Sequence, residues 1–296
     1  NDWWPLLLAA AFTAFLLSLA FLLRAHRSYG FGMLPPRPGP ATGRTRTLLG
    51  LTFRLNGGMT LTWFLAFGVL GLVFGQFATT VPELLQGDIA MAGFLSAGSL
   101  TPEDFTYGFL ATVLGLIGII ASVPGVQTML RMRSEEVLGR SEPFLAEPVS
   151  RPAYFAANLV AALAVSAVSL MISGTLVAAI ASQEAVGAHF GTVLLQALTT
   201  VPATWAVVAL AAAVVGARPK VPIAAWAGVV ASFALTFLGP TFDLWDWILG
   251  ISPFWHVPNV GISEVDWSGP LWVCLFAALF TAVGFIGYRR RDISAT

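Results

Sequence analysis

Charge is what this sequence most lacks. Of its 296 residues, 15 are Lys or Arg and 15 are Asp or Glu, so charged residues make up 10% of the chain. A soluble globular domain carries about 25% charged residues, which cover its surface. Hydrophobic residues make up 57% of this chain. The composition therefore excludes an ordinary soluble domain and predicts a polytopic membrane protein.

Cysteine, histidine and lysine are also scarce. Cys274 is the only cysteine, so an intramolecular disulfide is excluded. The three histidines lie in three different segments, and the paired histidines of a zinc protease motif are absent. A phosphate-binding P-loop needs Gly-Lys-Ser/Thr, yet the only lysine, Lys220, follows Arg218-Pro219. We therefore expect no cofactor in this chain and no ATPase activity of its own.

Long uncharged apolar runs are abundant. About 20 apolar residues in a helix cross a bilayer core roughly 30 Å thick, and helices keep their backbone groups paired in lipid. Seven runs qualify, at residues 3–23, 59–77, 107–130, 154–181, 190–215, 222–238 and 271–288. We predict an all-α polytopic membrane protein with seven transmembrane helices. Glycines at 68, 71, 75, 115 and 118 predict close packing of two of these helices.

The basic residues alternate between the stretches that separate these runs. Taken in order, the eight stretches contain 0, 6, 0, 4, 0, 2, 0 and 3 Lys plus Arg. Because Lys and Arg are retained on the cytoplasmic side of short loops, this order predicts seven crossings of the plasma membrane. Asn1 is then outside and the C-terminus is cytoplasmic. No basic stretch precedes the first run, so we expect the chain to be the C-terminal portion of a longer protein.

The second basic stretch, residues 131–152, combines four Arg with four Glu. Ser134 can cap a short helix that carries Glu135 and Glu136 in its first turn and ends at Gly139. Interspersed charges on a compact surface favour docking of a soluble partner. The alternative is a solvated loop whose charges pair among themselves.

Two other stretches are unusually apolar. Residues 47–56 end at Gly57-Gly58 and predict either an amphipathic elbow helix on the cytoplasmic surface or the first turns of the second span. Residues 239–270 hold several aromatic side chains but are broken by Gly250, Pro253 and Pro258. We predict that this outer segment forms one or two short helices of a re-entrant hairpin.

Polar residues inside the spans are the candidates for a translocation pathway. The fifth run contains Gln196, Thr199, Thr200 and Thr204 around Pro202. The fourth run contains Asn158, Ser166, Ser169 and Ser173. The alternative is that these groups bond a neighbouring helix or their own backbone.

Four short motifs together resemble one family of transporters. They are Gly32-Met-Leu-Pro-Pro-Arg-Pro-Gly-Pro40, the spacing Glu135-Glu136, Gly139-Arg140, Glu142 and Pro148-Val-Ser-Arg151, then Ser252-Pro-Phe-Trp-His-Val-Pro258, and finally Tyr288-Arg-Arg-Arg-Asp-Ile293. On these residues the chain resembles permeases of type 2 ABC exporters, in the actinobacterial subgroup described as exporters of polyketide antibiotics. The resemblance covers nearly the whole chain.

The resemblance implies a domain organisation. Residues 1–27 are then the last span of an N-terminal half and residues 28–47 a cytoplasmic Pro/Arg linker. Residues 48–296 are a six-span permease unit with an elbow helix, a coupling loop at 131–152 and an extracellular re-entrant segment at 239–270.

The same resemblance implies the functional residues and the partners. The partner-coupling residues are Arg131, Arg133, Glu135, Glu136, Gly139, Arg140, Glu142 and Arg151, and the aromatic residues of the extracellular gate are Trp245, Trp247, Phe254 and Trp255. Cytoplasmic ABC ATPase subunits bind ATP and Mg²⁺, and an N-terminal permease half or a second permease chain completes the transporter. We expect contact with the lipid bilayer and none with nucleic acid.

The expected function is ATP-driven export of hydrophobic or amphipathic compounds, such as antibiotics, drugs or lipids. Two alternatives are a membrane-embedded enzyme and a noncatalytic membrane scaffold. The pair Asp243 and Asp246, one helical turn apart, is the candidate for aspartyl chemistry in the first of these. A scaffold has no need of the charged stretch at 131–152.

Overall fold

The computed structural model describes residues 3–25, 47–87, 102–138, 150–183, 187–261 and 265–290. The chain divides into two compact units, Asn1–Arg44 and Thr45–Thr296. The described part of the first unit is one apolar helix, α1 (Trp4–Ala25). All the sites discussed below belong to the second unit.

Five long helices form the framework of the second unit. They are α2 (Leu48–Gly87), α4 (Pro102–Val137), α6 (Arg151–Ala181), α7 (Phe190–Ala217) and α10 (Ser268–Arg290). With α1, the described residues contain six helices long and apolar enough to cross a membrane. The predicted all-α polytopic membrane fold is confirmed.

One of the seven predicted spans is short. Run 222–238 forms α8 (Ala224–Phe233, 10 residues) and then five residues of π-helix, η1 (Ala234–Leu238). At 1.5 Å per residue these 15 residues measure about 22 Å, less than the roughly 30 Å of a bilayer core. Three further short elements follow: η2 (Pro240–Phe242), α9 (Asp246–Leu249) and η3 (Pro253–His256).

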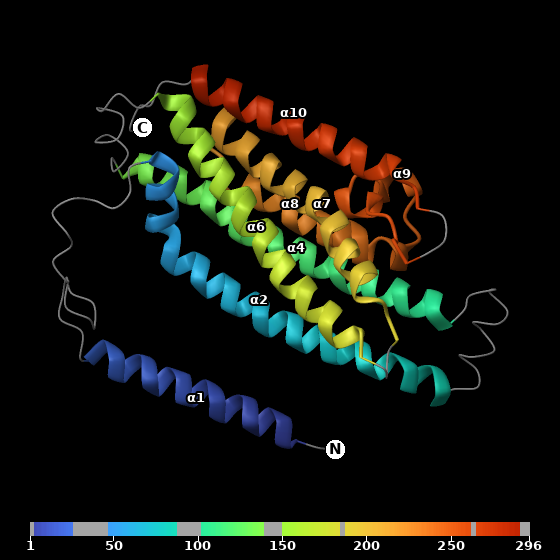
Figure 1. Cartoon of the computed structure of the whole chain (residues 1–296). Helices are drawn as coiled ribbons and strands as arrows, with labels where there is room; N and C mark the ends of the chain where they lie inside the picture. Colours follow the sequence, from blue (N-terminus) through green and yellow to red (C-terminus); the bar gives the residue numbers. More distant parts are fainter. Residues whose placement is uncertain are drawn as a thin grey trace. The chain divides into compact units, whose positions relative to one another are not determined.

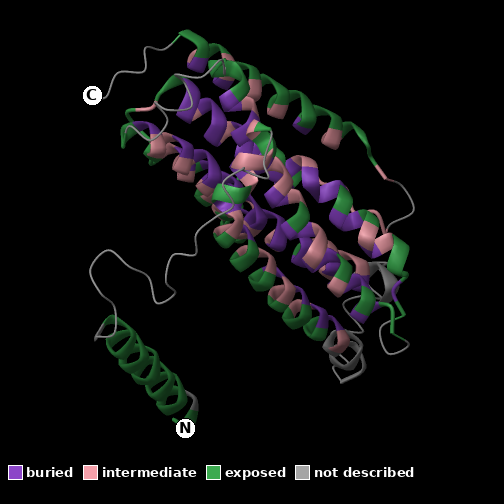
Figure 2. Ribbon diagram, turned by 60° about the vertical axis from the view of Figure 1, so that its left-hand side comes forward, coloured by how far each residue is buried: buried purple, intermediate pink, exposed green. Residues whose placement is uncertain are grey.

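The centre of the bundle consists of α4, α6 and α7 (Figure 1). Helix α2 packs along α6, α10 packs along α7, and α8 contacts α7 and α4. Buried residues concentrate in the three central helices, whereas α2 and α10 leave one side exposed (Figure 2). Leu114, Ile117 and Phe155 are among the fully buried side chains of this core.

Some of the predicted glycine contacts are present. A Cβ added to Gly71 would lie 2.7 Å from the Cα of Ser173, whose hydroxyl donates a 2.6 Å hydrogen bond to the Phe67 carbonyl. Gly75 on α2 and Gly118 on α4 are equally close to side chains of α6 and α7, whereas Gly68 and Gly115 have nothing within 4 Å of the added Cβ. Close packing of α2 against α6 therefore depends on particular glycines.

The stretch predicted as an elbow helix belongs to α2, which continues through Gly57 and Gly58. The first turns of α2 run in a different direction from the rest of the helix (Figure 1). Both sequence interpretations, an elbow helix and the first turns of the second span, are therefore combined in one bent helix, whose angled first part is continuous with the span.

The two ends of the bundle differ in charge. At one end of the bundle lie the starts of α2 and α6 and the ends of α4, α7 and α10 (Figure 1). The described Lys and Arg residues of this unit lie in or next to these helix ends. We call this the basic end. The opposite end, where η2, α9 and η3 lie, holds Asp243, Asp246 and Asp266 and is called the acidic end.

Candidate functional site

Residues 131–137, the first part of the predicted coupling loop, form the last two turns of α4. The prediction that Ser134 begins a separate short helix is wrong, because Ser134 lies inside α4. Two ion pairs between successive turns favour continuation of the helix. Arg131 Nε lies 3.7 Å from Glu135 Oε1, and Arg133 Nη1 lies 3.3 Å from Glu136 Oε2.

The two glutamates have different environments. Glu136 is buried beside Arg133, whereas the Glu135 side chain is partly exposed. Breaking a buried ion pair costs about 3–5 kcal/mol, and an exposed pair contributes about 0–1 kcal/mol. Glu136 and Arg133 therefore hold the end of α4 in place, while the Arg131–Glu135 pair lies partly exposed at its surface.

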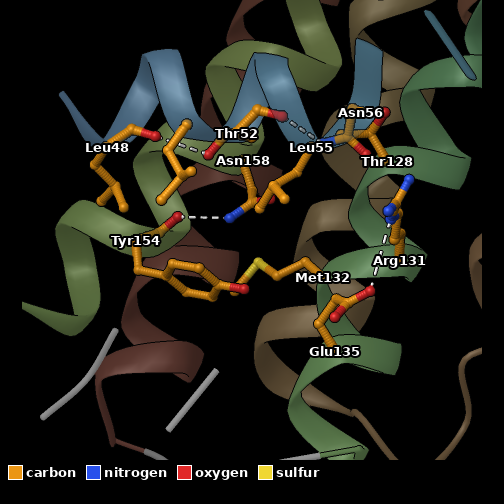
Figure 3. Close-up of a pocket in the computed structure, with 11 residues that line it drawn as sticks. Leu48, Thr52, Leu55, Asn56, Thr128, Arg131, Met132, Glu135, Tyr154 and Asn158 are labelled. Carbon is orange, nitrogen blue, oxygen red and sulfur yellow. Dashed lines mark hydrogen bonds and ion pairs between the residues drawn. The ribbon is translucent and has the colours of Figure 1, made fainter. Parts of the chain in front are cut away.

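A cavity of about 260 Å³ lies beside these residues, between the first turns of α2, the end of α4 and the start of α6 (Figure 3). Arg131 and Glu135 contribute one wall, and Asn56, Tyr154 and Asn158 contribute others. The amides of both asparagines donate to carbonyls one turn earlier in their own helices, at 2.9 Å. The predicted coupling residues thus adjoin the angled part of α2.

On its other side, the end of α4 borders an open groove of about 880 Å³. Arg133, Ser134 and Val137 face the turn between α7 and α8, which supplies Lys220 and Ile223. Val137 is 58% exposed and Ile223 is 76% exposed. Lys220 and Ile223 were not among the predicted coupling residues, although the third basic stretch of the sequence contains Lys220.

The remaining coupling residues are divided. Arg151 is exposed at the start of α6, where the Ser150 hydroxyl accepts a hydrogen bond from the Ala153 amide. Gly139, Arg140 and Glu142 lie outside the described residues. The structure therefore brings the residues at the end of α4 together with Arg151 at the basic end of the bundle.

The predicted pathway residues on α7 are buried and bonded within the chain. The hydroxyls of Thr199 and Thr200 donate to the Gln196 carbonyl, at 2.9 and 2.8 Å. The Thr204 hydroxyl donates to the Gly118 carbonyl of α4, at 3.0 Å. These bonds connect α7 to itself and to α4, and the pathway role of the four residues stays a prediction.

Gln196 makes two hydrogen bonds to the outer segment. Its Nε2 donates to the Pro258 carbonyl at 2.9 Å, and its Oε1 accepts from the Val260 amide at 2.8 Å. A side-chain amide that donates and accepts in this way takes the place of a backbone partner. It therefore pairs backbone N–H and C=O groups of the irregular segment where that segment contacts α7. Gln196 is 4% exposed.

Of the four predicted gate residues at the acidic end, Trp247 lies in α9, Phe254 and Trp255 lie in η3, and Trp245 directly precedes α9. Trp245, Trp247 and Trp255 are exposed, and the ring centroids of Trp245 and Trp247 lie 6.2 Å apart. Phe254 is buried against Ile119 of α4 and other apolar residues. Phe254 therefore anchors the segment, while the three tryptophans face outward.

Two further bonds hold the outer segment in shape. The hydroxyls of Ser252 and Thr236 lie 2.7 Å apart, which joins η3 to η1. The His256 Nε2 lies 2.8 Å from the Gly250 carbonyl, and it is the donor because a carbonyl only accepts. The segment therefore has a defined fold of its own over the ends of α7, α8 and α10.

The aspartates considered for an enzyme lie in this segment too. Asp243 is exposed and has a left-handed backbone with φ of 49°, and Asp246 begins α9 and is exposed. Among the described residues, no three His, Cys, Asp or Glu side chains form a group that could hold a metal ion.

Comparison with known proteins gives two matches. Residues 46–289 match the family model described as multidrug efflux system permease Rv1217c, C-terminal domain. The chain is 33% identical over 295 residues to the multidrug efflux system permease protein Rv1217c of Mycobacterium tuberculosis (strain ATCC 25618 / H37Rv). This alignment covers 98% of the chain and 54% of the relative, so the chain spans about half the length of that protein.

Both matches agree with the resemblance to exporter permeases carried by the four motifs. The family model covers the whole bundle from the first turns of α2 to the end of α10. Because the family model matches residues 46–289, well over half of its length, the chain belongs to the family of the C-terminal domain of the multidrug efflux system permease Rv1217c.

Proposed function

We propose that this chain is the membrane-spanning unit of an ATP-driven exporter that moves hydrophobic or amphipathic compounds outward across the plasma membrane. The observation that carries the proposal is its 33% identity, over 98% of its length, to a multidrug efflux permease. The six long apolar helices and the charged basic end support the same function.

In this proposal the basic end faces the cytoplasm, because Lys and Arg are retained on that side. A separate cytoplasmic ABC ATPase docks there and binds ATP and Mg²⁺. The chain spans about half of its relative. An N-terminal half or a second permease chain therefore completes the translocation pathway.

The end of α4 is the proposed point of coupling. Because residues 131–137 continue directly into a helix that contacts α6, α7 and α8, a push on these residues moves the centre of the bundle. Pro124 lies inside α4 and removes one helical hydrogen bond, which provides a place for the helix to bend. ATP-driven closure of the partner would then tilt the spans and open the pathway outward.

The docking surface combines charge and apolar contact. Arg131 and Glu135 supply partly exposed charge, and Val137 and Ile223 supply exposed apolar area on either side of the groove. Charged groups set orientation, whereas buried apolar anchors supply most of the affinity at such interfaces. Val137 and Ile223 are therefore the positions at which docking is tested most directly.

The experiment measures ATPase binding by the gently purified permease. Val137→Asp and Ile223→Asp should each weaken ATPase binding about tenfold or more, because a charge is placed at an apolar contact. The control is Gln183→Glu, which adds a charge at an exposed position near the acidic end. Recovery of the unaltered permease without any ATPase would refute the exporter proposal. Wild-type ATPase binding by both aspartate variants would remove this docking surface.

A further inference from the structure

An apolar cavity of about 540 Å³ lies between α7, α8 and α10 near the acidic end. Its walls are formed mainly by aliphatic and aromatic side chains, including Leu210, Leu235, Phe276 and Phe280. Residues 250–253 of the outer segment cover one side. Ligand pockets have volumes of about 300–1,000 Å³ and mostly apolar walls, so this cavity has the size and character of a binding site.

The polar groups of this cavity are few, and some of them are already hydrogen-bonded within the chain. The Ser252 hydroxyl is paired with Thr236, and the His256 Nε2 is bonded to the Gly250 carbonyl. None of the described residues that line the cavity is Asp, Glu, Lys or Arg. The cavity therefore suits an uncharged, apolar group.

A second cavity, of about 420 Å³, lies next to the first and is more polar. Asn259, Asp266 and Ser268 line it. Asp266 accepts hydrogen bonds from the Ser268 amide at 2.8 Å and from the Ser268 hydroxyl at 2.9 Å. These bonds fix the carboxylate and lower the pKa of Asp266, which keeps the group anionic at neutral pH.

The two cavities share His256 and Trp272 as lining residues. No Lys or Arg is among the described residues that line either one. In the sequence, residues 239–270 contain four acidic and no basic residues. A positively charged group therefore meets attraction without a competing Lys or Arg among the described lining residues, and Trp255 and Trp272 line the second cavity, where aromatic rings attract cations.

We propose that the two cavities form one substrate site for amphipathic monocations. The apolar part of the substrate lies in the first cavity, between α8 and α10, and its cationic group lies in the second, beside Asp266. The inference rests on the proposed export function and names the substrate class. Trp272 is 58% exposed and Ile251 is 64% exposed, so the apolar cavity is open at its side. A compound in the outer part of the membrane can enter there without crossing the bundle.

The test uses three probes with the same apolar group: 4-(1-pyrenyl)butyltrimethylammonium, 1-pyrenebutyrate and 1-pyrenebutanol. Binding to the permease in lipid nanodiscs is measured by equilibrium dialysis, with empty nanodiscs as the background for partition into lipid. The unaltered permease should bind the cation most tightly. An anion preference or equal affinity for all three probes would overturn the proposal.

Two variants separate the two cavities. Asp266→Asn should weaken binding of the cation about three- to five-fold, the upper part of the range for an exposed ion pair, and leave the alcohol unchanged. Ala231→Phe, at an exposed position that lines the apolar cavity, should weaken binding of all three probes. Asp243→Asn is the control, since it removes an exposed charge away from both cavities and asparagine tolerates the left-handed backbone there.

Transport measurements distinguish this inference from the proposed function. ATP-dependent export without the cation preference, or an equal loss with Asp243→Asn, would refute the site and leave the exporter intact. A cation preference sensitive to Asp266→Asn and Ala231→Phe, in a protein that shows no ATP-dependent transport, would refute the exporter and retain the site. Wild-type binding of all three probes by Ala231→Phe would exclude the apolar cavity.

Discussion

The hydrogen bonds of Gln196 allow a sharp prediction about the outer segment. Gln196→Met keeps the approximate shape of the side chain but removes both the donor to Pro258 and the acceptor for Val260. The Val260 amide should then exchange its hydrogen faster. The rest of α7 should keep its protection, because the backbone bonds of the helix are unchanged.

The size of the effect follows from the two bonds. An unsatisfied buried backbone group costs about 1–3 kcal/mol. Pro258 and Val260 are only half-buried, so water can replace part of each bond and the lower end of that range applies. A loss of about 1–1.5 kcal/mol in local opening corresponds to roughly five- to twelve-fold faster exchange at Val260.

The measurement is hydrogen exchange by mass spectrometry of the peptide that contains Val260. Gln183→Met is the matched control, because Gln183 is exposed at the end of α6. Unchanged exchange in Gln196→Met, or an equal increase in Gln183→Met, would refute the role of these bonds. Impaired transport with unchanged exchange would instead favour the pathway role predicted for Gln196.

Two further predictions concern packing and pH. Gly71→Ala should destabilise the bundle by about 1–3 kcal/mol, because its Cβ would lie 2.7 Å from Ser173, whereas Gly68→Ala, with open space around it, should be neutral or stabilising; thermal unfolding in detergent compares the two, and equal midpoints would contradict the packing. The hydrogen bonds from Ser268 lower the pKa of Asp266, so their contribution to stability is present above the ordinary carboxyl pKa and is lost as pH falls through the lowered value. Ser268→Ala should raise the pKa of Asp266 toward its ordinary value in a carboxyl NMR titration, and an unchanged titration would disprove that cause.

Much of the site was predictable where it depends on sequence-local chemistry. The charges at 131–136 marked the end of the apolar run in α4, although the helix itself continues to Val137, and the broken aromatic stretch indicated an outer segment with short helical turns. The helical state of Ser134 was missed, because a serine followed by two acids is also the pattern of a helix start. What decided between the two was the pairing of Arg131 with Glu135 and of Arg133 with buried Glu136, which continues α4.

The residues missed by the sequence are those whose meaning depends on neighbours distant in the chain. Ile223 has no local feature that marks it, and it borders the groove only because the turn between α7 and α8 lies beside the end of α4. In the sequence, Asp266 does not differ from any other loop acid. Only the structure shows that the cavity it lines shares residues with an apolar cavity.

By itself, the sequence determined the membrane class and the helical fold, because both follow from composition and from the requirement that backbone groups be paired in lipid. Only the tertiary structure decided which polar groups are already bonded and which cavities exist. It showed that Gln196 bonds the outer segment, and that Gly71 packs closely against α6 whereas Gly68 does not. The physical reason is that contacts and cavities depend on which helix faces meet. The hydrophobic periodicity of one helix does not specify the side chains of the helix that packs against it.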